Sequence, residues 1–187
     1  MANEPNNKIE LEIVTPKGRA LAVTADEVTA PSVEGEFGVM PGHLPLLAAI
    51  RTGLISYRQG SETKKCAVGP GFAECAANRV MILTDEFIER EQVDPVLVRK
   101  ELAEVQAELA KTVAAGEPLS ASGPAEPLIK RENWLAAQLE LYGDPPPPRI
   151  KTMSELSFGL HENYEGLAAD KGAEAEDSSG AEDKAAH

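Results

Sequence analysis

The chain has 187 residues, with 31 acidic and 18 basic side chains, so its formal net charge is −13 at neutral pH. Proteins that bind nucleic acid or anionic lipid need clustered Lys and Arg, and this balance argues against both classes. No apolar stretch reaches the roughly 18 residues that cross a bilayer, and the first residues lack the basic and apolar regions of a signal peptide. The length allows one domain or two small ones.

The region from about Lys8 to Thr84 has the pattern of short β-strands. Ile9, Leu11 and Ile13 alternate with glutamates, which is the period of a half-buried strand. Further candidate strands cover residues 20–23, 27–30, 53–58, 63–68, 72–76 and 79–83, separated by turn signals. Many short strands at regular spacing predict a sandwich or a barrel.

The segment from Val33 to Leu47 combines strand-like residues with three glycines and two prolines. Glycine permits positive φ, and proline fixes φ and lacks an N–H, so the segment must make tight, specified turns. The residues with this turn-forming role are Gly35, Gly38, Pro41, Gly42 and Pro45. The apolar run from Leu44 to Ile50 follows at once, and we expect it to be buried.

The pattern changes to a helical period after the strands. Asp94 before Pro95 is typical of a helix start. Apolar residues at helical spacing begin at Val98, and Gly116 is the expected end of the helix. A second helix, residues 127–142, also has one apolar face, so the two predict an antiparallel hairpin. The expected divisions are residues 1–87, 88–144 and 145–187, the last a Pro-rich linker with an acidic tail too poor in large apolar residues to fold.

The two cysteines, Cys66 and Cys75, have no histidine or cysteine nearby at the spacing of a metal site. The histidines, His43, His161 and His187, are far apart in the sequence. We therefore expect free thiols with a structural role and no bound metal.

The turn Gly35-Glu36-Phe37-Gly38, followed by Pro41-Gly42-His43 and Pro45-Leu46-Leu47, resembles a stretch of the epsilon subunit of bacterial F-type ATP synthases, the equivalent of the mitochondrial delta subunit. The resemblance covers about residues 8–142. It implies an N-terminal antiparallel β-sandwich followed by a C-terminal antiparallel two-helix hairpin, here with a disordered acidic tail.

The function implied by the resemblance is that of a non-catalytic rotor subunit without catalytic residues or cofactor. In this family the sandwich binds the gamma subunit and sits on the polar loops of the c-ring, which couples rotation to ion conduction. The hairpin restrains ATP hydrolysis through the alpha and beta subunits, and the candidate contacts here are Lys130 and Arg131. The residues implied to face the ring are Glu36, Met40 and His43. The implied location is the cytoplasmic face of the bacterial plasma membrane, with attachment only through the complex.

Two alternatives remain open from the residues themselves. Glu36 also fits an ordinary solvated carboxylate, and His43 a residue that fixes its own turn. The alternative function is a stand-alone β-sandwich binding module with a helical oligomerisation hairpin. ATP binding is not expected, because ATP-binding members carry Arg-Ala where this chain has Leu97 and Val98.

Overall fold

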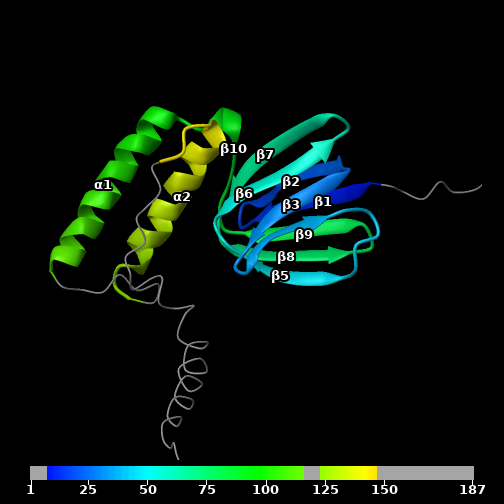
Figure 1. The fold of residues 1–187 in the computed structure, drawn as a ribbon, viewed down its shortest axis with the longest axis horizontal. Helices are drawn as coiled ribbons and strands as arrows, with labels where there is room; N and C mark the ends of the chain where they lie inside the picture. The colour runs from blue at the N-terminus through cyan, green and yellow to red at the C-terminus, as the bar shows by residue number, and fades with distance from the viewer. Residues whose placement is uncertain (1–7, 116–122, 147–187) are drawn as a thin grey trace, which may run out of the picture. The chain divides into compact units, whose positions relative to one another are not determined.

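The computed structural model describes residues 8–115 and 123–146 of the chain. Ten strands occupy its first part (Figure 1). They are β1 (Ile9–Thr15), β2 (Gly18–Ala25), β3 (Glu27–Ser32), β4 (Gly35–Val39), β5 (Leu46–Ile50), β6 (Gly53–Gln59), β7 (Glu62–Val68), β8 (Gly71–Ala76), β9 (Arg79–Thr84) and β10 (Phe87–Glu89). A 3₁₀ turn, η1 (Arg90–Gln92), leads to α1 (Pro95–Ala114) and α2 (Glu126–Tyr142).

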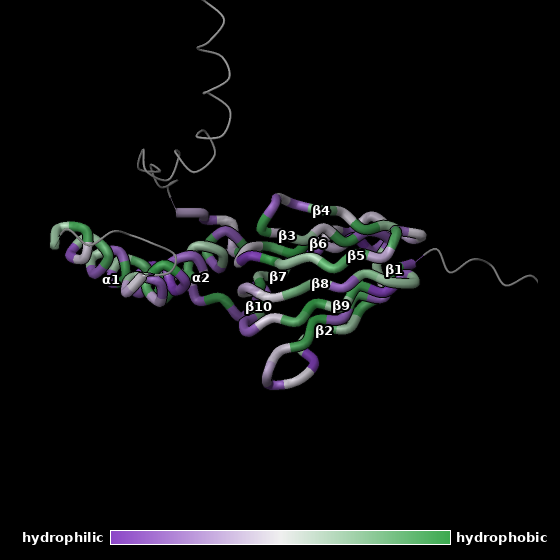
Figure 2. The backbone as a smooth tube through the Cα atoms, turned by 90° about the horizontal axis from the view of Figure 1, so that it is seen from below, coloured by the Kyte–Doolittle hydropathy of each residue, from purple (hydrophilic) through white to green (hydrophobic). Residues whose placement is uncertain are grey.

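The strands form a folded sheet in the order β10-β7-β6-β3-β5-β8-β9-β1-β2, with β4 on the remaining side of β3. The two halves of this path meet through a single residue pair, Ser32 of β3 with Ile50 of β5. They close on each other, since β2 contacts β6 and β1 contacts β3. In Figure 2, β4 and β2 accordingly lie on opposite sides of the strand region. Together with the hairpin, this arrangement confirms the predicted fold class.

The main core lies between the two halves of the sheet. The predicted alternation in β1 is confirmed, because Ile9, Leu11 and Ile13 are at most 1% exposed while Glu10 faces solvent. Cys66 and Cys75 are buried, free thiols in the same core, as expected.

The prediction that the run from Leu44 to Ile50 is buried is wrong. Ile50 is 2% exposed, but Leu44 is 79% and Leu47 72% exposed. Leu44 lies in the loop before β5, and the side chains of a strand alternate between its two faces, which turns Leu47 outward.

The hairpin begins as predicted. The carboxylate of Asp94 accepts hydrogen bonds from the N–H groups of Val96 and Leu97 at 3.0 and 3.1 Å, which caps α1. Gly143, in the left-handed conformation with φ 101°, ends α2. The predicted stop at Gly116 and the predicted disorder of the tail fall on residues 116 and 147–187, outside the described part.

A second apolar cluster joins the hairpin to the sheet. Its buried members are Ala67, Val93, Val98, Leu102, Trp134, Leu135, Ala137, Leu139 and Leu141. Ala67 belongs to β7, and Leu54 of β6 and Ile88 of β10 pack against the same cluster. α2 therefore covers β6 and β7, and both parts belong to one compact unit within residues 1–146. Neither described helix is long and apolar enough to cross a membrane.

Candidate functional site

The loop between β4 and β5 is built on a tight turn from Met40 to His43. The His43 N–H donates to the Met40 carbonyl at 3.0 Å, which closes the turn. Pro41 fixes its own φ, and Gly42 has φ 83°, a combination typical of a type II turn. A side chain at Gly42 would be strained by that φ, so the two residues together determine the course of the loop.

A second turn holds the first in place. Ala77 and Asn78 connect β8 to β9 with φ of 49° and 62°, as a two-residue turn of type I′ requires. The Gly42 N–H donates to Oδ1 of Asn78 at 2.7 Å. A turn between residues 76 and 79 is predicted from the sequence, but this contact between residues 36 positions apart is not.

The side chains of the Met40 turn face solvent. Met40 is 58% and Leu44 79% exposed. The His43 ring lies with Nδ1 2.7 Å from the Leu44 carbonyl, and since a carbonyl only accepts, Nδ1 carries the proton. His43 therefore helps to fix its own loop, and the loop presents an apolar tip.

Glu36 lies at the opposite end of β4 from Met40. Four residue-to-residue steps of extended chain separate them by about 13 Å. Glu36 is exposed beside the turn at residues 32–35, where Oγ of Ser32 accepts from the N–H of Glu34 at 3.1 Å. The predicted ring-facing residues Glu36, Met40 and His43 thus do not cluster. Instead they follow one strand and the loop after it.

The strand that joins these residues is an edge of the sheet. β4 pairs only with β3 among the described strands, so its other side presents unpaired backbone groups. Gly38 lies within this strand opposite Thr29 and has no positive φ, so the structure places it outside any turn. Pro45 is exposed directly before β5.

An apolar row crosses the outer side of the half of the sheet that consists of β5, β8, β9 and β1. Strand pairing places Ala49, Phe72, Leu83 and Val14 in one row across β5, β8, β9 and β1. At the usual strand spacing the row spans about 14 Å. Phe72 is 57% and Leu83 49% exposed. Leu47 adjoins the row on β5, and we call Leu47, Phe72, Leu83 and Val14 the outer apolar face.

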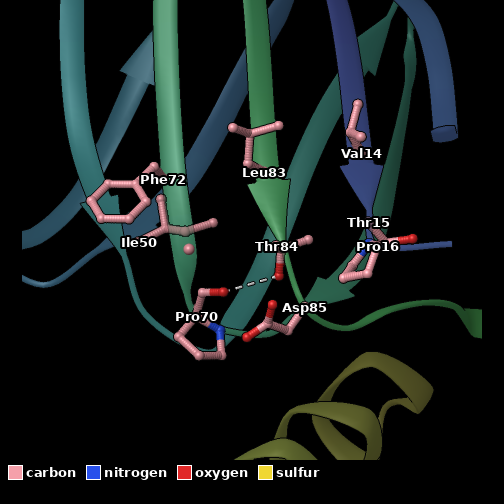
Figure 3. Close-up of a pocket in the computed structure, with 10 residues that line it drawn as sticks. Val14, Thr15, Pro16, Ile50, Pro70, Phe72, Leu83, Thr84 and Asp85 are labelled. Carbon is pink, nitrogen blue, oxygen red and sulfur yellow. Dashed lines mark hydrogen bonds between the residues drawn. The ribbon is translucent and has the colours of Figure 1, made fainter. Parts of the chain in front are cut away.

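An open hollow of about 590 Å³ lies at one end of this face. Figure 3 shows Phe72 and Leu83 on neighbouring strands, with Pro70 and Asp85 at the end nearer to α2. The hydroxyl of Thr84, at the rim of the hollow, lies 3.3 Å from the Pro70 carbonyl oxygen and 3.1 Å from that of Glu86, and it donates its one proton to either of them. Its lining is mostly apolar and includes no arrangement of nucleophile and base.

Sequence analysis missed the outer apolar face, although β9 carried a signal. Val80 and Ile82 point into the core, so an ordinary one-sided strand would have polar residues between and after them. Met81 and Leu83 occupy those positions instead. Large apolar residues on both sides of a strand indicate a second apolar face.

The hairpin residues proposed for inhibition are paired in this structure. Lys130 forms an ion pair with Glu126 at 2.7 Å, and Arg131 forms one with Glu101 of α1. Glu132, the next residue in the sequence, is only 4% exposed. Its Oε1 accepts from Nε2 of Gln106 at 3.1 Å, so it is part of the contact between the helices.

Comparison with known proteins decides the family. The family described as "ATP synthase, Delta/Epsilon chain, beta-sandwich domain" matches residues 8–90. An ATP synthase epsilon chain of Syntrophotalea carbinolica is 37% identical over 108 residues, which are 58% of this chain and 78% of the relative. That of Anaeromyxobacter dehalogenans is 38% identical over 113 residues, 60% of this chain and 86% of the relative.

The chain belongs to the family of ATP synthase epsilon chains. This membership confirms the resemblance and the prediction of a non-catalytic ATP synthase subunit. A chain in the cryo-EM structure of the Euglena gracilis mitochondrial ATP synthase shares the fold, with a TM-score of 0.52 and 20% identity over 77% of this chain and 82% of that one. No group of metal-binding side chains occurs in the described part of the epsilon chain.

Proposed function

We propose that the chain is the rotor subunit that joins the gamma subunit to the c-ring at the cytoplasmic face of a bacterial plasma membrane, held there only through the complex. The observation that carries the proposal is the outer apolar face. The exposed side chains of Phe72, Leu83 and Leu47 on this face cost solubility, and such patches on soluble domains mark protein contacts.

The outer apolar face is the proposed gamma contact. Its side chains come from four hydrogen-bonded strands, which hold them in a rigid arrangement. Rigidity suits a rotor, since torque is lost where a contact yields. Phe72 within this row fits the enrichment of aromatic residues at interface centres.

The exposed edge of β4 is the proposed ring contact. It presents Glu36 at one end and Met40 with His43 at the other, so one flat partner lying along β4 touches all three. Glu36 is suited to accept charge-assisted hydrogen bonds from an arginine on a ring loop. The hairpin is the proposed contact to alpha and beta, and we propose weak inhibition, because Lys130 and Arg131 already have acidic partners.

The gamma contact is tested by Phe72→Asp in F1 depleted of this subunit. A charge at a buried interface position lacks a partner, so we expect at least a hundredfold loss of affinity. Val33→Asp is the matched control, because Val33 is 66% exposed and lies in the turn beside β4, outside the outer apolar face. Unchanged affinity of Phe72→Asp, with an unchanged melting temperature, would refute the gamma contact.

The ring contact is tested by Glu36→Lys in reassembled enzyme. We expect weaker binding to the c-ring and lower proton-driven ATP synthesis. Glu104→Lys, at an exposed position on α1, makes the same charge change away from β4. Normal proton pumping and normal ring affinity of Glu36→Lys would contradict the proposal.

A further inference from the structure

We infer that Asn78 is a positioning residue for the ring contact, because its side chain fixes the Met40–His43 turn against the rest of the sandwich. The inference rests on the proposed contact between this turn and the ring. It adds a residue that acts on the ring contact through Gly42.

Asn78 connects three segments that are distant in sequence. Its Oδ1 accepts from the Gly42 N–H at 2.7 Å, and its main-chain carbonyl accepts from the Glu10 N–H at 2.9 Å. Its own backbone forms the turn between β8 and β9. The loop after β4 is therefore tied to β1, β8 and β9, which belong to the other half of the sheet.

The bond to Asn78 uses the N–H of Gly42, which has no hydrogen-bond partner within the β-turn. In a type II turn the N–H of the last residue closes the turn, here His43 to Met40. That internal bond shapes the turn but does not place it on the molecule. The amide of Gly42 points outward from the turn, and its bond to Asn78 supplies the placement.

Position 78 requires a residue that tolerates a positive φ and also carries a hydrogen-bond acceptor close to the backbone. Few residue types meet both requirements. Its φ of 62° is tolerated by Gly, Asn and Asp and is costly for most others. Asn and Asp also carry an oxygen one methylene from the backbone, whereas Gly carries none. Without the bond to residue 78, the Met40–His43 turn must become ordered when the ring binds. The entropy cost of this ordering weakens binding, although the contacting residues stay the same.

Two variants at position 78 separate the backbone requirement from the acceptor. Asn78→Gly keeps the backbone of the β8–β9 turn and removes the acceptor, whereas Asn78→Asp keeps both. The measurements are amide hydrogen exchange at Gly42, the melting temperature, and affinity for the detergent-solubilised c-ring. For Asn78→Gly we expect faster exchange at Gly42, nearly unchanged melting and about tenfold weaker ring binding. Asn78→Asp is expected to match the wild type.

Three other results would overturn either the role of Asn78 or the ring contact itself. Faster exchange with unchanged ring affinity, while Glu36→Lys binds weakly, would overturn the inference and leave the ring contact standing. Weak ring binding by Asn78→Gly and Asn78→Asp alike would also overturn it, since the acceptor would not be the cause. Unchanged affinity of both Asn78→Gly and Glu36→Lys would overturn the ring contact and the inference with it.

Discussion

Gly71, the first residue of β8, is the position where the sheet tolerates no side chain. A Cβ there would overlap the Leu83 carbonyl oxygen and lie 2.9 Å from the Leu83 carbonyl carbon and 3.0 Å from Cα of Thr84. Ordinary carbon contacts are about 3.5–4.0 Å, and all three atoms are backbone, which no rotamer change can move away. Gly71→Ala must therefore push β8 and β9 apart by roughly 1 Å at the Gly71–Thr84 pair.

The cost has two parts. Overpacking of this kind costs about 1–3 kcal/mol, and weakening one ladder hydrogen bond adds about 1 kcal/mol. We expect Gly71→Ala to lose about 3 kcal/mol of unfolding free energy, or about 10 °C in melting temperature for a folded region of this size. Because Gly71 lines the hollow beside Phe72, the displacement also reaches the proposed gamma face.

The assay is thermal unfolding followed by circular dichroism, with Gly38→Ala as the control. A Cβ at Gly38 has nothing within 4 Å, and its φ is not positive, so the same substitution should leave the melting temperature almost unchanged. A melting temperature for Gly71→Ala within 3 °C of the wild type would show that the strands separate cheaply and that this steric reasoning fails.

Three further predictions concern titration, thiol reactivity and nucleotide. Burial raises the pKa of the Glu86 carboxyl above its usual 4.5, so the folded state binds this proton more tightly than the unfolded state and loses stability as the pH rises from about that value. Glu86→Gln should therefore raise the melting temperature at pH 7 and not at pH 4. An equal rise at both pH values would contradict this prediction. Burial raises the pKa of Cys66 to about 12, so a thiol reagent at pH 8 should label it only after unfolding, and rapid labelling of the folded protein would count against its buried position. Calorimetric titration with ATP should show no saturable sub-millimolar binding, because Leu97 cannot donate to a phosphate and Arg99 is paired with Asp144; a measured affinity in that range would refute it.

Features that depend on neighbouring residues could be predicted from the sequence. The alternation of Ile9, Leu11 and Ile13 gave β1, because a half-buried strand needs only a two-residue period. Asp94 before Pro95 gave the start of α1, because the cap bonds reach residues two and three positions away. The second helix begins at Glu126, one residue before the predicted start.

Features that depend on residues distant in the sequence could not be predicted. Glu132 has the sequence context of a surface charge, and its burial follows from Gln106, 26 residues earlier on the other helix. The exposure of Leu47 follows from the absence of any described segment over the outer side of β5, β8, β9 and β1. An apolar run predicts only that water is unfavourable there. Whether the same chain or another subunit covers it depends on tertiary structure.

The docked position of the hairpin is held mainly by apolar packing. The ion pairs Lys130–Glu126 and Arg131–Glu101 lie within the hairpin, one along α2 and one between α1 and α2, so neither ties the hairpin to the sheet. The cluster that joins Trp134 and Leu135 to Ala67 is buried, and full burial of one large apolar side chain contributes about 1.5–3 kcal/mol. Moving the hairpin to alpha and beta would therefore leave both ion pairs intact, and its main cost would be to uncover the apolar packing at Ala67 on β7. Apolar surface on the partner must therefore replace that packing before the two basic residues can contribute to inhibition.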